Sequence, residues 1–515
     1  MSFFTLQFVG FMLAAVLCYY VIPQRFRWLV LLAASYVFYM IGGWRVVFYL
    51  LFTTGVTYTA GRVLGAFNSK ISETPKEEAD VRKKWKKRKT MVAALSILAA
   101  FGVLFVLRYL DFTLEFLTSS DRFSLNLIIP LGVSFYTFQS VGYVIDVYRA
   151  KHTPEKNLLK YALFVSFFPQ MIQGPISRFH QLAPQLVEGS KLDFKNIQHG
   201  IQLAMWGYFK KLVIADRAAV VVDLVYADSG AFNGTMVAFA VFLYCIQLYC
   251  DFSGGIDITR GIAKMFGIEL MENFRRPIFS TSLLDFWRRW HITLGAWLKD
   301  YLFYALALSK PIVRLGKFTR GRFKGTLGKL IPTAICTFIV YFTIGIWHGA
   351  NFRWIVFGLW NASIITISFL LAGTFASWKD RLNIRDDSLY WRIFSIMRTM
   401  LIVFIGRYVT RAPRFLAGIT MLWQTISDFS IRSLFNGSLY TLGLSRFDTW
   451  VVLFGILTVV TLEFFQERGV RIRETLDSRG FFVQWAAILF PIAAILFLGI
   501  LGWNYDSPQF IYAQF

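Results

Sequence analysis

Two histidines in this sequence have the neighbours best suited to chemistry. The first, His348, lies in the turn Trp347-His348-Gly349-Ala350-Asn351, which joins two apolar runs within residues 329–371. Each run is about long enough to cross a membrane, and no acidic or lysine-rich loop separates them. We therefore expect His348 to lie at membrane depth, where an ionisable side chain is costly and is a functional candidate by default. An unperturbed histidine side chain has a pKa of about 6.5, which suits the removal of a proton from a substrate.

The second candidate is His291, at the end of Asp285-Phe286-Trp287-Arg288-Arg289-Trp290-His291. On a continuous helix, His291 would share a face with Trp287, and Asp285 would lie one turn from both arginines. Aromatic rings, guanidinium groups and an imidazole on one short helix suit a polyphosphate or nucleotide headgroup. Both histidines also have a plainer interpretation as interfacial side chains: His348 bonded to a carbonyl, and His291 on an amphipathic helix with lipid-binding arginines.

The composition indicates an all-α polytopic membrane protein. The 515 residues are 56% hydrophobic, 18% aromatic and only 16% charged, and the mean hydropathy is +0.52, too apolar for a soluble chain of this size. The net charge of +24 does not indicate nucleic acid, because the basic residues lie in short loops between apolar runs, where they mark topology and contact lipid headgroups. Four cysteines lie inside apolar stretches without metal-site spacing, so we expect no disulfide, no structural zinc and no other metal. These are Cys18, Cys245, Cys250 and Cys336.

We expect about 11–13 transmembrane helices. The loop 68–90 carries nine Lys and Arg residues against four acidic ones, so the positive-inside rule makes it cytoplasmic and puts both chain termini outside. The basic loop 310–329 is then also cytoplasmic, and the turn at His348 lies nearer the outer side. The predicted spans are residues 4–22, 28–44, 46–67, 91–110, 123–147, 200–226, 231–249, two within 329–371, 393–410, 450–465 and 482–503.

Two segments do not fit simple spans. Residues 161–176 are interrupted by Pro169, Gly174 and Pro175 and are predicted to be re-entrant. Residues 251–306 mix aromatic and charged residues too densely to face lipid, so we expect re-entrant and cytoplasm-facing helices that line a cavity.

Four further charged residues have two possible interpretations, and three further histidines have no predicted function. The charges Lys210, Lys211, Asp216 and Arg217 either line the inner vestibule or start an interfacial helix by snorkelling. The remaining histidines, His152, His180 and His199, are predicted to be solvated in loops.

Several motifs in a fixed order resemble the membrane-bound O-acyltransferase family, and within it the bacterial branch of the alginate O-acetyltransferase membrane subunit and the teichoic acid D-alanyl transferase. The resemblance covers essentially the whole chain, and the tail 510–515 and the chain length favour the alginate type. One departure is Gly255-Ile256-Asp257, where that type has an aromatic residue followed by Ser-Asp. The motifs are Ile129 to Tyr136 (IPLGVSFY), Phe168-Pro169-Gln170 with Gly174-Pro175-Ile176, Gln247 to Gly254 (QLYCDFSG), Glu272-Asn273-Phe274, Phe286 to His291 (FWRRWH) and Trp347 to Asn351 (WHGAN).

The resemblance implies one membrane domain, 1–515, around a central tunnel, with N-terminal spans in 1–150, a catalytic core in 151–375 and C-terminal spans in 376–515. It implies that His348 is the essential histidine and His291 a second one near the donor side. The other expected substrate-binding or donor-binding residues are Trp347, Asn351, Asp251, Asp257, Asn273, Trp287, Arg288, Arg289 and Trp290.

The chemistry expected of such a site is acyl transfer to a sugar hydroxyl. His348 would remove the alcohol proton, and a thiolate leaving group with a pKa of roughly 8.5 needs little acid assistance, which permits direct transfer in a ternary complex. No Gly-x-Ser-x-Gly elbow occurs, but a nucleophile elsewhere in the fold or on a partner stays open. We expect no tightly bound cofactor. The donor would be acetyl-coenzyme A or an acyl-carrier-protein thioester, and the acceptor an extracellular polysaccharide, with the enzyme in the bacterial inner membrane.

Three alternatives stay open. In the first, the protein relays the acyl group to a separate SGNH-type extracytoplasmic acetyltransferase. In the second, it transfers D-alanine to teichoic acid. A polysaccharide or lipid transporter would also have broken helices and buried charges, although the spacing of the two halves indicates no inverted repeat.

Overall fold

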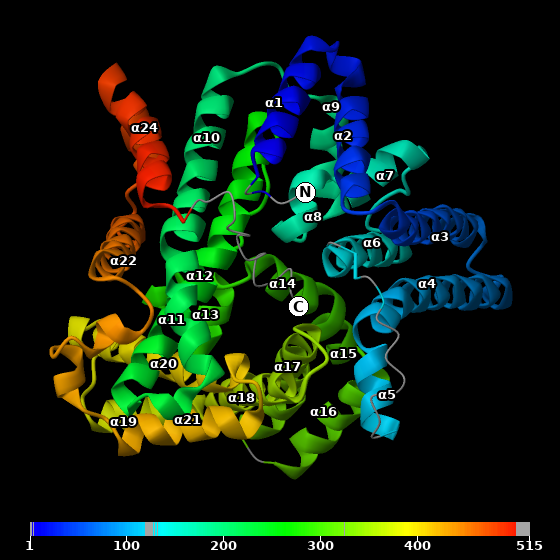
Figure 1. Cartoon of the computed structure of the whole chain (residues 1–515). Coiled ribbons are helices and arrows are strands. Elements are labelled where there is room, and N and C mark those ends of the chain that lie inside the picture. Colours follow the sequence, from blue (N-terminus) through cyan, green and yellow to red (C-terminus); the bar gives the residue numbers. More distant parts are fainter. Residues whose placement is uncertain are drawn as a thin grey trace. The chain divides into compact units, whose positions relative to one another are not determined.

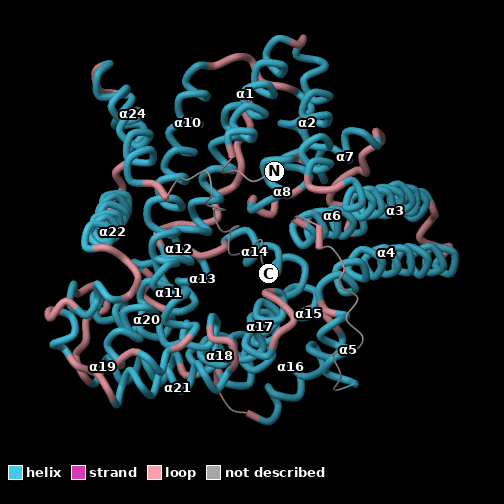
Figure 2. The backbone as a smooth tube through the Cα atoms, in the orientation of Figure 1, coloured by secondary structure: helices cyan, strands magenta, loops and turns pink. Residues whose placement is uncertain are grey.

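The computed structural model describes residues 3, 5–118, 127, 129–130, 132–323 and 325–500. The predicted all-α fold is confirmed: the regular structure of this part of the chain is helical, apart from one isolated antiparallel bridge between Phe274 and Trp290 (Figures 1 and 2). The tail 510–515 lies outside the described residues, as does most of the stretch 119–131 at the start of one predicted span.

The chain divides into two compact units, and helices α10 and α12 contribute to both. The first unit contains Met1–Ala204 and Gly255–Met271, and the second contains Met205–Gly254 and the described residues from Glu272 onward. The helices that begin in the first unit are α1 (Leu6–Val21), α2 (Arg27–Ile41), α3 (Val47–Glu73), α4 (Ala79–Arg108), α5 (Leu110–Thr118), α6 (Val133–Tyr148), α7 (Leu158–Ser166), α8 (Phe168–Gln173), α9 (Phe179–Glu188) and α10 (Phe194–Tyr208).

The second unit continues from α10 through a π-helix into α11. Its helices are the π-helix η4 (Phe209–Ala215), α11 (Asp216–Ala227), α12 (Gly234–Met265), α13 (Leu283–Arg289), α14 (Ile292–Leu298), the π-helix η7 (Lys299–Phe303), α15 (Tyr304–Ala307), α16 (Lys310–Arg322), α17 (Leu327–Trp347), α18 (Phe352–Leu370), α19 (Ala372–Arg381), α20 (Leu389–Arg411), α21 (Phe415–Ser427), α22 (Arg446–Glu467), α23 (Ile472–Asp477) and α24 (Phe481–Leu498).

Seven of the described helices are long and apolar enough to cross a membrane: α4, α12, α17, α18, α20, α22 and α24. Others are apolar but shorter: α1 has 16 residues and is therefore about 24 Å long, less than the roughly 30 Å of a hydrocarbon core. On α24, Phe482, Phe490 and Phe497 are each more than 70% exposed, as expected of a surface that faces lipid. The chain is a multi-pass membrane protein.

In the first unit, α3 and α4 form a helical hairpin that packs against α6 (Figure 1). The prediction that residues 68–90 form a loop is wrong, because α3 and α4 extend into this range and leave only residues 74–78 between them. Lysine and arginine are good helix formers, and here Lys70 and Arg88 pack over the ring of Trp85. Helices α3 and α4 therefore continue past their apolar segments into the basic residues.

Two other boundaries differ from prediction. Helix α12 does not end near Tyr249 but runs on to Met265, because two-thirds of its most apolar window is buried and its polar residues meet protein rather than lipid. The predicted loop 310–329 contains α16. The interruption of residues 161–176 is confirmed, since α7 ends at Ser166 and α8 ends at Gln173, before Gly174 and Pro175.

Candidate functional site

His348 follows the last residue of α17 and lies at the turn into α18, as the sequence predicted. Asn351 caps α18, and its side-chain oxygen accepts a hydrogen bond from the backbone N–H of Arg353 at 3.1 Å. The two helices touch through their backbones, because a Cβ placed on Gly345 would lie only 2.4 Å from the Cα of Gly358. A glycine contact of this kind allows membrane helices to approach closely, and it fixes where the turn holds His348.

The imidazole of His348 lies in an aromatic enclosure and is only 5% exposed. It stacks on Trp354 with the ring centroids 4.9 Å apart and the planes 24° from parallel. The edges of Trp347 and Phe357 meet it at 5.0 Å and 5.7 Å. The side chain is therefore buried in the protein rather than placed at an exposed interface.

Trp347 also contacts the second histidine, so one indole touches both predicted catalytic imidazoles. The ring centroids of His291 and Trp347 lie 5.4 Å apart. On another side, the buried ring of Phe252 meets His291 edge to face at 4.9 Å. The structure thus brings His291 together with Trp347 and His348, which lie in a different motif much later in the sequence.

The continuous helix predicted through His291 is wrong. Helix α13 ends at Arg289 and α14 begins at Ile292, and His291 between them has a left-handed backbone with φ of +49°. Short strand-like pairing draws this stretch out of the helix: Phe274 bridges to Trp290, and the N–H of Ile292 donates to the carbonyl of Asn273 at 3.0 Å. Such strain in a non-glycine residue is typical of functional sites.

The protonation state of His291 follows from its contact with Asn273. The Oδ1 of Asn273 accepts the backbone N–H of Thr293 at 3.0 Å and the Thr293 hydroxyl at 2.9 Å, and it lies 3.2 Å from His291 Nδ1. Since this oxygen is an acceptor, Nδ1 carries the proton and Nε2 keeps its lone pair. Burial lowers the pKa of His291 to about 3, so the ring is neutral near pH 7.

The acid tolerance of the fold should depend on His291. In the unfolded chain its pKa is about 6.5, so the neutral ring stabilises the fold fully above that pH, and this stability is lost as the pH falls toward 3. Between these two pH values we expect the chain to take up one proton on unfolding, so the free energy of unfolding should fall by about 1.4 kcal/mol for each pH unit of acidification. Thermal unfolding of the detergent-solubilised protein between pH 7 and 4 measures this slope. The variant His291→Asn should lose it, while His199→Asn should keep it, and equal slopes in all three proteins would contradict the assignment.

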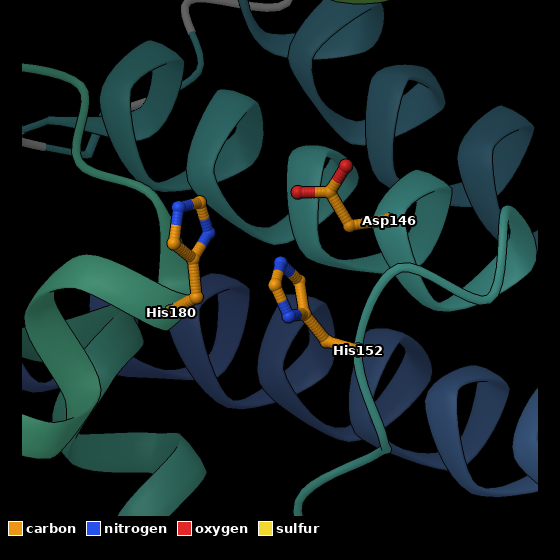
Figure 3. Close-up of side chains that lie close together, drawn as sticks. All are labelled: Asp146, His152 and His180. Atoms are coloured by element: carbon orange, nitrogen blue, oxygen red, sulfur yellow. The ribbon is translucent and has the colours of Figure 1, made fainter.

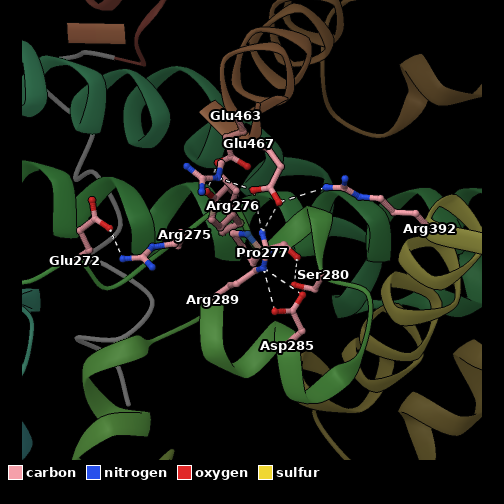
Figure 4. A network of polar contacts seen from close by, with 11 residues as sticks. Glu272, Arg275, Arg276, Pro277, Ser280, Asp285, Arg289, Arg392, Glu463 and Glu467 are labelled. Atoms are coloured by element: carbon pink, nitrogen blue, oxygen red, sulfur yellow. Dashed lines mark hydrogen bonds and ion pairs between the residues drawn. The ribbon is translucent and has the colours of Figure 1, made fainter. Parts of the chain in front are cut away.

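A mostly buried carboxylate, Glu467 at the end of α22, holds three arginines from different segments (Figure 4). Its oxygens lie 2.7 Å from Arg276, 3.0 Å from Arg289 and 3.6 Å from Arg392. Arg289 also pairs with Asp285 at 3.2 Å, the one-turn contact that the sequence predicted. Arg289 is therefore engaged within the protein, whereas its neighbour Arg288 is exposed.

The two predicted donor-binding tryptophans are also packed into the second unit. The indole N–H of Trp287 donates to the side-chain oxygen of Asn361 at 3.0 Å. Trp290 stacks on Phe286 with a centroid separation of 5.4 Å, and the guanidinium of Arg407 lies 5.8 Å from its ring. Both indoles are less than 10% exposed.

The charges around the π-helix η4 are buried and paired. Lys211 Nζ lies 2.6 Å from Asp251 and 2.9 Å from Asp216, and Lys210 donates to the hydroxyl of Ser253 at 2.8 Å. Lys210, Lys211, Asp216 and Arg217 are each at most 6% exposed.

The snorkelling interpretation of these charges is therefore wrong, because their head groups are buried and contact polar or charged side chains inside the protein rather than water. Asp251, predicted to bind substrate or donor, neutralises Lys211. Asp257 belongs to the first unit, where it pairs with Arg260 at 3.9 Å.

Comparison with known proteins identifies the chain. A model of MBOAT, the membrane-bound O-acyltransferase family, matches residues 150–406. A Pseudomonas putida protein named "Probable alginate O-acetylase AlgI" is 35% identical over 404 residues, which cover 76% of this chain and 73% of that protein. The chain belongs to the membrane-bound O-acyltransferase family. It is thus an O-acyltransferase, and the predicted family resemblance is confirmed.

More distant relatives of this O-acyltransferase differ in the group or polymer that their names specify. A peptidoglycan O-acetyltransferase from Helicobacter pylori is 31% identical over 53% of this chain and 54% of its own length. A teichoic acid D-alanyltransferase from Bacillus subtilis is 25% identical over 55% of this chain and 69% of its own length. The family match, residues 150–406, includes both histidines and the α17–α18 turn.

Several neighbours of the histidines in this O-acyltransferase were not predicted. Trp354 and Phe357 are three residues apart at the start of α18, so they share a helix face, and this spacing after a turn was a usable signal. Phe252 belongs to the motif Gln247 to Gly254, whose sequence does not indicate a contact with His291. Glu467 had no local signal, because its arginine partners lie 75 to 191 residues away.

The contact between Gly345 and Gly358 gives a testable expectation for this O-acyltransferase. Gly345→Ala places a methyl group against the backbone of α18 and should lower the stability by about 1–3 kcal/mol, because the two helices must separate. It should also lower acyl transfer, because the turn that carries His348 moves with them. The matched control is Gly373→Ala in α19, where nothing lies within 4 Å of an added Cβ. Unfolding temperature and activity of the two purified variants provide the comparison. If both variants have the same unfolding temperature and activity, the contact between Gly345 and Gly358 contributes to neither.

Proposed function

We propose that this O-acyltransferase moves an acetyl group from a cytoplasmic thioester, through a tunnel in the protein, to hydroxyls of an extracellular polysaccharide. The observation that carries the proposal is a pair of buried imidazoles, His291 and His348, which both contact the indole of Trp347. The relatives named as O-acetylases of alginate and peptidoglycan are more similar to this chain than the D-alanyltransferase, which favours acetyl over D-alanyl. We further propose the bacterial inner membrane as its location, with both termini outside.

In the proposed reaction His348 acts as the general base. It removes the proton of the acceptor hydroxyl as that oxygen attacks the thioester carbonyl, and a base near neutral pH is suited to this step. The carbon–sulfur bond then breaks, and the thiolate leaves with the electron pair. Because the conjugate thiol has a pKa of roughly 8.5, this departure needs little help from an acid. Transfer is direct, without an acyl-enzyme.

His291 has a different proposed role. Its Nδ1 proton is held by Asn273, and its neutral Nε2 can only accept a hydrogen bond, so it suits the orientation of a donor rather than proton delivery. Arg288 is the exposed guanidinium of its pair and is the one proposed to meet a donor phosphate. We propose that Asn273, Trp287, Arg289 and Trp290 position the residues around His291. We propose the same positioning role around His348 for Trp347, Asn351 and Asp251.

The proposal is tested by reconstituting the purified chain in lipid vesicles. Labelled acetyl-coenzyme A is supplied on the cytoplasmic face and alginate or peptidoglycan on the other, and label in polymer esters is measured for the wild type and His348→Ala. Label in the polymer with the wild type alone supports direct transfer. Label that appears only after addition of an SGNH-type acetyltransferase indicates the acyl relay, and transfer only of D-alanine indicates the teichoic acid reaction. Unmodified polymer that crosses the vesicle membrane would indicate a transporter and overturn the proposal.

A further inference from the structure

Three side chains with metal-ligating atoms lie together in the first unit, and none of them is among the residues assigned to catalysis. Asp146 lies near the end of α6, His152 lies in the connection that follows, and His180 lies in the first turn of α9 (Figure 3). One carboxylate oxygen and one ring nitrogen from each histidine lie within 4.8 Å of one another. The two imidazoles stack with their centroids 4.5 Å apart and their planes 22° from parallel.

Neighbouring contacts hold both histidines beside α6. The hydroxyl of Tyr143 on α6 accepts the backbone N–H of Glu155, three residues after His152, at 3.0 Å. The ring of Tyr143 also packs against Phe179, directly before His180, at a centroid distance of 4.8 Å. The backbone positions of both histidines beside α6 therefore follow from the packing around Tyr143.

The cluster has a buried side and an open side. Asp146 is 4% exposed, His152 is half-buried and His180 is exposed. An ion in solution can therefore reach the imidazoles, while the carboxylate lies at the bottom of the site. The prediction of solvated histidines in loops is correct for the exposure of His180 but wrong for its place, since His180 lies on α9. It also missed that His152 and His180 stack in a pair beside a buried acid.

We propose that Asp146, His152 and His180 bind a divalent transition metal ion, with zinc as the occupant. Two imidazoles and one carboxylate are ligands that zinc favours, and three protein ligands leave a fourth position for water. Atoms bound to zinc at about 2.0–2.2 Å lie roughly 3.3–3.5 Å apart. Rotation of the exposed His180 ring and the half-buried His152 ring closes the remaining gap.

One competitor of a metal ion for the carboxylate is a lysine. Lys151 Nζ lies 3.5 Å from Asp146 Oδ1, but its side chain is 49% exposed and can turn into water when a metal ion binds. Because half of the lysine side chain is in contact with water, solvent weakens its attraction to the carboxylate. The doubly charged ion, bound by three ligands, is the stronger partner for the buried oxygen.

The position of the ion gives it a structural role. Residues 153–179 lie between the two histidines and contain α7 and α8, the interrupted segment predicted to be re-entrant. A metal bound by His152 and His180 closes this loop and ties it to α6. Closure of a loop removes conformational freedom from the unfolded chain and so stabilises the folded arrangement. This role is independent of the proposed acyl transfer.

The test uses the purified full-length protein in detergent. After incubation with zinc and removal of the excess, elemental analysis should find about one zinc per chain, and cobalt substitution should give visible d–d absorption bands. His152→Gln and His180→Gln should lose both signals. His199→Gln removes a histidine outside the cluster and should keep them.

Two results would overturn the proposal. The first is folded, monodisperse wild-type protein that retains no zinc and gives no cobalt bands, a measurement that needs no variant to fold. The second is equal metal loss in His199→Gln and in the cluster variants, which would indicate nonspecific binding. A lower unfolding temperature after chelation, in the wild type but not in His180→Gln, is the expected result for stability.

Discussion

Replacing His348 with alanine is expected to lower acyl transfer by about 10²–10⁴-fold, the usual contribution of a positioned general base. In the proposed mechanism the imidazole takes the proton of the acceptor hydroxyl as the oxygen attacks, and alanine removes this base. The rate of label transfer from acetyl-coenzyme A to polymer, measured at saturating donor, gives this factor directly. A wild-type rate in His348→Ala would show that the base is another residue.

Two controls separate catalysis from packing. His348 is stacked on Trp354, so alanine also removes a packed ring, and His348→Gln keeps most of the side-chain volume without a base. We expect both variants to lose activity while His348→Gln keeps the wild-type unfolding temperature. His199→Ala, a histidine change in the first unit, should alter neither. The pH dependence of the remaining activity should lose the limb that reports the base.

The variant Lys211→Met is expected to lower the free energy of unfolding by about 3–5 kcal/mol, because it leaves two carboxylates buried without their cation. Lys211 is 2% exposed, and its ammonium group lies between Asp216 and Asp251. The loss is measured by thermal or denaturant unfolding in detergent. If Lys211→Met is as stable as the wild type, the buried charges are not held as the structure places them.

The matched control applies the same substitution to an exposed ion pair. Lys264 pairs with Glu269, whose side chain is 64% exposed, so Lys264→Met should change the stability by less than about 1 kcal/mol. A second comparison removes one of the stranded charges. The double variant Lys211→Met with Asp251→Asn should recover part of the loss, because one carboxylate remains buried instead of two.

The parts of the fold that the sequence predicted are those set by hydrophobic runs. The α17–α18 hairpin and the turn at His348 follow from two apolar stretches around a short polar one. The interruption before Gly174 follows from proline and glycine. In both cases the signal lies within a few residues of the feature it predicts.

The parts that were not predicted depend on partners far along the chain. The charged residues of α12 looked unable to continue a span, but Asp251 is matched by Lys211, 40 residues earlier. His291 should lie on a helix by local pattern, yet Asn273 and the Phe274–Trp290 bridge hold it in a left-handed turn. The aromatic enclosure of His348 and the metal-ligand cluster likewise arise from tertiary packing, which periodicity does not encode.

The arginine contacts of Glu467 have a consequence for the order in which the protein is made. Arg276 and Arg289 leave the ribosome well before Glu467, which follows Arg289 by 178 residues. At about 5–20 residues per second, these arginines wait roughly 10–35 s for their acidic partner. During that interval the segment around His291 lacks the anchor that later fixes it, so the geometry around His291 is complete only when α22 has been made.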